Sequence, residues 1–281
     1  MSVTLQTRPG RLDFFVRGEQ FATYRYDEAG APGFSALLAA GGRAITPPEE
    51  ETDGPALCLA HGSVNGVAFP AAPVSTEAAQ NVPTGRIVTT EMVARRGAYS
   101  VGFRQTCAWI GPEGMPMLTD VRTARIAPGP GDGRILDLAL QLRAPEDRPV
   151  TLGRTETALL LLRLATPLCP SGGGQLRNSV GDYGPAQMHG RSAAWCAGVG
   201  VVRGETIGFA LLDHPDNPWH PSPWLVLENG TLSPSPFAWR TQELPPGGAL
   251  SLRYRLHVYS GYVEAGWADA RLAEFTHARH A

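Results

Sequence analysis

Two histidines and two aspartates lie within eight residues of each other in a proline-rich segment. Residues 212–224 read LDHPDNPWHPSPW and follow an apolar run, so the acidic and basic groups begin where a predicted strand leaves its sheet. Four prolines fix φ and exclude both a helix and a central strand, which predicts a rigid, extended loop. An imidazole beside a carboxylate suits proton transfer, because the pKa of histidine lies near working pH.

We therefore predict a general acid/base site in this loop. His214 or His220 is expected to transfer the proton, and Asp213 is expected to orient the imidazole. Asn217 and Trp219 would contact the substrate. The alternative is structural: Asp and Asn side chains cap turns, histidines fill surface notches and prolines stiffen a connection.

Four further residues are candidate substrate-binding groups. His61 begins the stretch HGSVNG, in which Asn-Gly indicates a tight hairpin turn, so a partly buried histidine is an equal alternative there. The others are His189, Glu228 and Arg163. Arg163 lies in an apolar run and needs a carboxylate partner, for which Glu156 is a candidate. The chain has no HxH or HExxH spacing and no glycine-rich dinucleotide fingerprint, so we predict neither a metal nor a cofactor.

The elements that must position these groups are short strands. Apolar or alternating runs are separated by Gly, Pro and Asp turns, as in a sandwich or barrel. The predicted strands span residues 12–16, 20–26, 56–60, 85–95, 98–110, 117–126, 135–143, 150–152, 158–164, 193–202, 205–212, 224–227 and 250–258. One helix is predicted at 262–277. We expect an all-β fold, a large antiparallel β-sandwich (a galactose-mutarotase-like supersandwich is one candidate form) with a short C-terminal helix, formed by residues 1–281 as a single domain.

Composition excludes several function classes. The 281 residues are 43% hydrophobic and carry a formal charge of −2, which argues against a nucleic-acid surface. All 24 basic residues are arginine, so lysine Schiff-base and Walker-lysine chemistry are excluded. This arginine bias is typical of GC-rich, actinobacterial-style genomes. With no signal peptide or membrane-spanning run in sight, we expect a cytoplasmic protein with reduced cysteines. Its expected partner is a small-molecule substrate, not nucleic acid or membrane, and a homodimer is one compatible assembly.

The proline-rich segment also resembles a known family. Together with NGTLSPSPFAW at 229–239, it is similar to the bacterial PmoA-like family, a name that does not indicate methane oxidation. The matching positions are Asp213, His214, Pro215, Asn217, Pro218, His220, Pro221 and Trp224, then Gly230, Pro236 and Phe237. The stretches 61–69, 152–165 and 189–200 are also similar. The resemblance implies a β-sandwich that acts on carbohydrates.

Two departures from that family leave alternatives open. An Asp-His-Pro-His-His-Arg box is replaced by residues 53–58, DGPALC, and an arginine expected after Trp224 is absent. Our first expectation is an enzyme of lyase, epimerase or hydrolase type on a sugar-like or polyhydroxylated molecule. The second is a non-catalytic binding module, which the missing box favours. The third is a biosynthetic cyclase with an apolar pocket, because Ala56, Leu57 and Cys58 would suit an apolar substrate.

Overall fold

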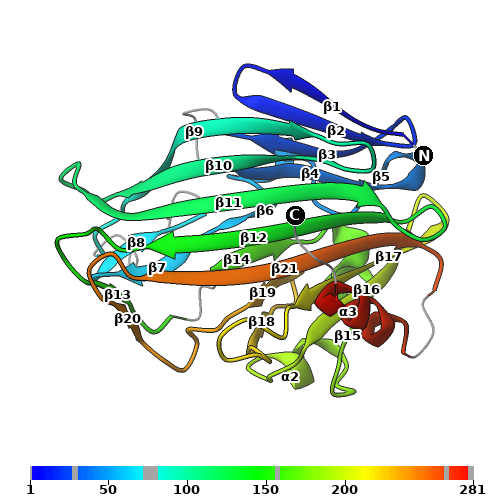
Figure 1. Cartoon of the computed structure of the whole chain (residues 1–281). Coiled ribbons are helices and arrows are strands. Elements are labelled where there is room, and N and C mark those ends of the chain that lie inside the picture. The colour runs from blue at the N-terminus through cyan, green and yellow to red at the C-terminus, as the bar shows by residue number, and fades with distance from the viewer. Residues whose placement is uncertain (1, 27–30, 72–81, 156–158, 263–265, 278–281) are drawn as a thin grey trace.

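Two large antiparallel sheets face each other in the computed structural model, which describes residues 2–26, 31–71, 82–155, 159–262 and 266–277 (Figure 1). The first sheet has the order β1 (Val3–Arg8), β2 (Arg11–Val16), β3 (Glu19–Arg25), β4 (Gly33–Ala39), β6 (Leu57–Leu59), β14 (Leu160–Arg163), β19 (Thr231–Pro234) and β18 (Trp224–Val226), with β5 (Arg43–Ala44) beside β4. The second has the order β15 (Gln175–Asn178), β16 (Trp195–Val202), β17 (Glu205–Asp213), β21 (Ala249–Ser260), β12 (Arg134–Arg143), β11 (Pro116–Pro128), β10 (Val101–Ile110) and β9 (Arg86–Arg96).

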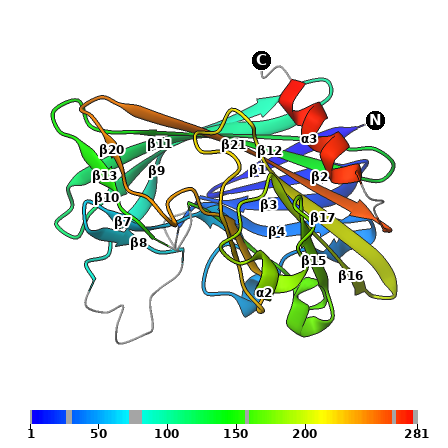
Figure 2. The same cartoon turned by 90° about the horizontal axis from the view of Figure 1, so that it is seen from below.

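A small third sheet and two helices complete the described fold. The sheet has the order β20 (Gln242–Leu244), β13 (Val150–Leu152), β7 (His61–Val64) and β8 (Val67–Phe69). The helices are α2 (Gly184–Met188) and α3 (Trp267–His277). Seen from below, α3 lies on the outer side of the second sheet, away from α2 (Figure 2). The expectation of an all-β antiparallel sandwich with a short C-terminal helix is confirmed.

The core lies between the inner faces of the two large sheets. Strand β12 shows how the sequence builds it: Leu136, Leu138, Leu140 and Leu142 alternate along the strand and are all buried. Side chains of a strand point alternately to its two faces, so this spacing places four leucines on one face. The same cluster takes in apolar residues of the first sheet and of the small third sheet.

A charged pair is enclosed within this core. Asp120 and Arg122 lie two apart on β11, so both point inward. The Arg122 guanidinium donates two hydrogen bonds to the Asp120 carboxylate, at 2.8 and 2.7 Å, and a third to the carbonyl of Pro32 at 3.1 Å. The indole N–H of Trp109 donates to Asp120 at 2.6 Å. A buried ion pair is retained at low cost only when its remaining polar atoms are bonded in this way.

Helix α3 covers the outer face of the second sheet. Ala268 and Phe275 of the helix pack against an apolar patch formed by Trp195, Ala197, Ala210 and Leu212. The Arg255 guanidinium lies 4.5 Å from the ring centroid of Phe275 and is paired with Asp137. The helix begins at residue 267 rather than at the predicted 262. None of the helices within the described residues is long and apolar enough to cross a bilayer.

All four cysteines are free and buried. Cys58 lies on β6 together with Leu57, and both are packed between neighbouring strands, as is Ala56. The replaced 53–58 box therefore contributes β-strand and core residues.

Candidate functional site

The proline-rich segment leaves the second sheet at the end of β17 and turns back on itself. The backbone N–H of Asp213 still donates to Ala194 of the neighbouring strand region, at 2.9 Å. Two turns follow, in which the N–H of Asn217 donates to the carbonyl of His214 at 2.9 Å and that of His220 donates to Asn217 at 3.1 Å. Proline is the second residue of each turn, Pro215 in the first and Pro218 in the second, and its ring fixes φ there. The segment therefore forms a loop of two successive hydrogen-bonded turns, in line with the loop predicted from its prolines.

The Asp213 carboxylate organises this loop. It is fully buried and accepts hydrogen bonds from the side-chain amide of Asn217 at 2.7 Å and from the backbone N–H of Ser222 at 2.9 Å. Nδ1 of His220 lies 3.1 Å from the same carboxylate. A buried carboxylate without such donors would be very costly, so its position follows from the three donors around it.

Asn217 ties the loop to strand β21. Its amide donates to the carbonyl of Arg253 at 2.7 Å, and its oxygen accepts the Arg253 N–H at 2.6 Å. This two-point contact with the backbone holds Asn217, and through it Asp213, at a fixed place beside the second sheet. Asn217 is therefore a positioning residue rather than a group that faces a substrate.

His220 is the imidazole that keeps an open edge. Its side chain is 17% exposed, whereas Asp213 is completely enclosed. Because an ionised carboxylate only accepts hydrogen bonds, the proton shared with Asp213 belongs to Nδ1 of His220. With Nδ1 directed at the carboxylate, Nε2 is the ring nitrogen left for a substrate, which is the arrangement of a general base oriented by a carboxylate.

His214 lies in a different environment. Its side chain is buried, its Nδ1 accepts the N–H of Asp216 at 3.0 Å, and its ring meets that of Phe275 edge-on at 4.6 Å. Helix α3 thus covers His214 from the solvent side. Of the two candidates for proton transfer, His214 is thus closed off from solvent, because a helix more than fifty residues away in sequence packs over it.

Trp219 and His61 both pack against the ring of Phe237. The Phe237 ring lies 5.9 Å from the Trp219 ring and 5.0 Å from the His61 ring, both approximately edge-on. His61 begins β7 and is fully buried, so it supports Phe237 and Trp219 from below rather than facing solvent. The structure therefore links His61 to the segment through Phe237, as a buried packing residue rather than a group that faces a substrate.

Burial of His61 predicts a loss of stability in mild acid. It lowers the pKa of His61 from 6.5 to about 4, and the facing backbone of Gly153 and Ser63 offsets only part of this effect. In the unfolded chain the ring takes up a proton near pH 6.5, so stability is complete above that value and falls as pH decreases toward 4. At pH 4.5 this residue alone costs about 2 kcal/mol of unfolding free energy.

The measurement is urea unfolding at pH 7.5 and pH 4.5 for the wild type and for His61→Gln. The wild type should lose about 2 kcal/mol more than the variant on acidification, since glutamine does not titrate. The buried His257 is present in both proteins and cancels in the comparison. Equal losses would show that His61 is not the acid-sensitive group.

The remaining predicted binding residues lie elsewhere. His189 follows α2, is exposed, and places Nδ1 3.3 Å from the carbonyl of Val226. Glu228 is exposed in the turn between β18 and β19, and Arg163 is half-buried on β14. No hydrogen bond or ion pair among the described residues links these three to Asp213 or His220. Glu156, the expected partner of Arg163, is outside the described residues.

Two arginine–tryptophan contacts beside the segment were not foreseen from the sequence. The Arg240 guanidinium lies 5.1 Å from the Trp219 ring centroid, and that of Arg154 lies 5.5 Å from Trp239, whose side chain is 56% exposed. Arg154 also donates to the carbonyl of Ala238 at 3.0 Å. The run Phe-Ala-Trp-Arg at 237–240 is the sequence feature that could have indicated these contacts, since it joins two aromatic rings to a cation in one short turn.

The side chains of this segment do not form a set of metal ligands within the described residues. Across the described residues, no group of three or more His, Cys, Asp and Glu side chains is arranged to hold an ion. The Asp213 carboxylate is already engaged by three donors.

Comparisons with known proteins identify one family. The profile of a family of unknown function, DUF6807, matches residues 11–273. No curated protein matches the chain. A solved structure described as "Crystal Structure Analysis of HI1317" aligns with 93% of this chain and 100% of its own at 11% identity, with a TM-score of 0.23 that carries no structural argument. Because the matching profile covers most of the sequence, the chain belongs to the DUF6807 family.

Proposed function

We propose that this protein is an enzyme that moves a proton on a sugar-like or polyhydroxylated small molecule, with His220 as general acid/base. The observation that carries the proposal is the buried Asp213 carboxylate, which holds Nδ1 of a partly exposed His220 at 3.1 Å. In such a pair the carboxylate fixes the tautomer and stabilises the imidazolium that forms during proton transfer. The reaction would be of lyase, epimerase or hydrolase type, and we place the protein in the cytoplasm.

In this reaction Nε2 of His220 would take a proton from a C–H or O–H group of the substrate. The imidazolium so formed is stabilised by Asp213, which has no solvent to screen it. The same nitrogen would return the proton to the leaving group, and epimerisation would in addition require the deprotonated intermediate to turn its other face toward His220. Asn217 and the Ser222 N–H keep the carboxylate in place throughout, since both donate to it.

The backbone at Trp219 supports a functional role for this segment. Trp219 adopts φ +66°, the left-handed region that bulky residues rarely occupy. Such a conformation costs on the order of 1–2 kcal/mol and persists only where contacts impose it. The Trp219 indole contacts Phe237 and Arg240. Trp219 directly precedes His220 in the chain. Strain of this kind concentrates at sites of binding and catalysis.

Two arginine–tryptophan contacts support the proposed substrate class. An indole face stacks on the apolar face of a sugar ring, and guanidinium groups donate to its hydroxyl or carboxylate oxygens. Trp239 with Arg154 and Trp219 with Arg240 supply both features. The resemblance of the 213–239 stretch to the PmoA-like family, with its suspected action on carbohydrates, supports the same class.

A binding module without catalysis is the second candidate. It is favoured by the exposed Trp239 and by the structural use already made of Asp213, which is saturated by donors from its own loop. In that case His220 would contribute a hydrogen bond to the ligand and no proton transfer.

The test is incubation of the protein with a panel of hexoses, aldonates, uronates and glycosides in heavy water, followed by mass spectrometry. Loss of water, gain of water or uptake of deuterium at carbon indicates lyase, hydrolase or epimerase chemistry respectively. Binding of a panel member detected by ligand NMR without any mass change would support the binding module instead. If no compound is bound or altered, the proposed substrate class is wrong.

A further inference from the structure

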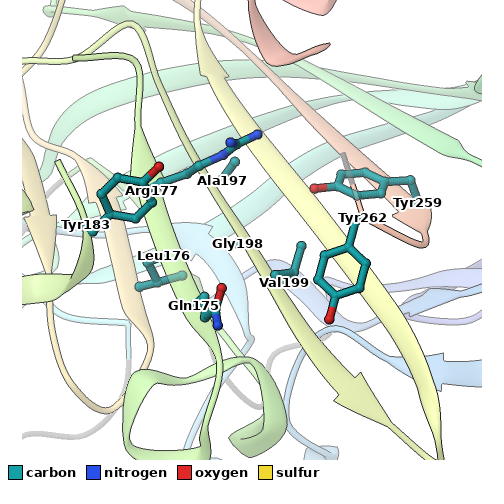
Figure 3. A pocket seen from close by; sticks show the side chains of 9 residues that line it. All are labelled: Gln175, Leu176, Arg177, Tyr183, Ala197, Gly198, Val199, Tyr259 and Tyr262. Atoms are coloured by element: carbon teal, nitrogen blue, oxygen red, sulfur yellow. The ribbon is translucent and has the colours of Figure 1, made fainter. Parts of the chain in front are cut away.

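A cavity lies on the outer face of the second sheet, away from His220. Its volume is about 220 Å³, and it spans β15, β16 and the end of β21 (Figure 3). Gly208, beneath it, is five residues along β17 from Asp213, or roughly 17 Å at the usual rise of a strand. Its lining comprises Gln175, Leu176, Arg177, Tyr183, Ala197, Gly198, Val199, Tyr259 and Tyr262.

Strand register gives this cavity a low floor. Gln175 pairs with Val199, Val199 with Gly208, and Gly208 with Tyr259, so these four residues form one row across the sheet. Gly208 has no side chain, and the Tyr259 ring lies over it, 2.2 Å from where a Cβ would stand. The adjacent row has only methyl groups in its middle, at Ala197 and Ala210, with Arg177 on one side and His257 on the other. Small residues in the middle and long ones at the sides make a trough.

The Tyr259 hydroxyl is an unused donor in this trough. The side chain is only 7% exposed, and its hydroxyl oxygen is buried without a hydrogen-bond partner among the described residues. The Trp267 ring packs against the Tyr259 ring at 4.6 Å and fixes its direction. Burial raises the pKa of Tyr259 far above 10, so the hydroxyl keeps its proton. A buried hydroxyl without an acceptor is costly, which points to an acceptor that arrives with a ligand.

A cation faces this hydroxyl across the floor. The Arg177 guanidinium lies 5.9 Å from the ring centroid of Trp195, and its positive charge acts on Tyr259. In Figure 3 the Arg177 head group and the Tyr259 hydroxyl are both directed toward the space above Ala197. At the two ends, Tyr183 and Tyr262 expose most of their rings.

We propose that this trough binds a small carboxylate-bearing ring compound. The guanidinium of Arg177 and the hydroxyl of Tyr259 would both donate to the carboxylate, and the ring would lie on the Ala197–Val199 floor between Tyr183 and Tyr262. A planar cation beside a hydroxyl donor matches a carboxylate in shape and charge. The volume is below the usual range for drug-sized ligands, which limits the occupant to about one six-membered ring.

The test is calorimetric titration of the full chain with benzoate and, separately, with D-glucuronate, since aromatic and sugar acids share the proposed chemistry. Methyl benzoate, which lacks the charge, should bind at least about tenfold more weakly than benzoate. Tighter binding of benzoate identifies an aromatic acid as the natural class, and tighter binding of glucuronate identifies a sugar acid. Failure of both to bind at millimolar concentration overturns the proposal.

Matched variants locate the site. Tyr259→Phe removes one oxygen and Arg177→Gln removes the charge, and each should raise the Kd of the bound acid about tenfold or more. Tyr99→Phe and Arg148→Gln, which change exposed residues elsewhere, should leave the Kd unchanged. An unchanged Kd in Tyr259→Phe would contradict the assignment. His220→Gln should not affect this Kd, so the result is independent of the function proposed for His220.

Discussion

Replacing His220 by glutamine is expected to lower turnover about 100- to 10,000-fold on the substrate that the panel identifies. Glutamine retains a polar side chain of similar length and can still donate to Asp213. It lacks the nitrogen that takes and returns a proton near neutral pH. The loss should therefore appear in kcat, with KM changed by less than the turnover number, because the group acts in the transition state.

The control is His277→Gln, an exposed residue at the end of α3, which should retain full turnover. Far-ultraviolet circular dichroism and the melting temperature of His220→Gln show whether the fold is intact. A folded variant that retains more than about a tenth of wild-type turnover would exclude His220 as the acid/base. Asp213→Asn offers an independent check, since an amide donor facing Nδ1 would favour the wrong tautomer of His220.

Local sequence determines only part of the candidate site around Asp213 and His220. Four prolines between residues 215 and 223 fixed the expectation of a rigid loop, because each restricts its own φ and that of the residue before it. The pairing of Asp213 with His220 required the actual turns, which no spacing rule supplies. The burial of His214 depended on Phe275, a contact between distant segments. Trp239 and Arg154 meet across a still longer separation in sequence.

The same distinction holds for the fold. The predicted strand 135–143 is nearly the observed range of β12, and its alternating leucines form the buried face. Strand β1 was missed because VTLQTR buries little and lies at the edge of its sheet. Strand β19 was missed because it is short and ends in proline, which usually excludes a central strand. Asp137 lies on the face of β12 opposite the leucines, and Arg255 and α3 cover it there. Tertiary contacts determine which strands lie at a sheet edge and which sheet faces are covered by other elements.

The buried charge pair of β11, Asp120 and Arg122, also depends on tertiary contacts. Removing one of its charges has the largest expected effect on stability. Asp120→Ala should lower the unfolding free energy by about 3–5 kcal/mol, because the Arg122 charge would remain in the core with no counter-charge. Trp109 would also lose the acceptor of its indole N–H. At about 2–4 °C per kcal/mol for a chain near this size, the melting temperature should fall by roughly 10 °C.

Denaturant unfolding of the wild type and three variants tests this expectation. Asp147→Ala removes one partner of an exposed pair with Arg148 and should cost less than about 1 kcal/mol. The double variant Asp120→Ala, Arg122→Met removes both buried charges and should recover most of the loss, since burying two charges costs about as much as their attraction returns. If the double variant is no more stable than Asp120→Ala alone, the loss comes from the cavity and the Trp109 hydrogen bond rather than from an unpaired charge. The comparison thus separates electrostatic from packing contributions at the centre of the sandwich.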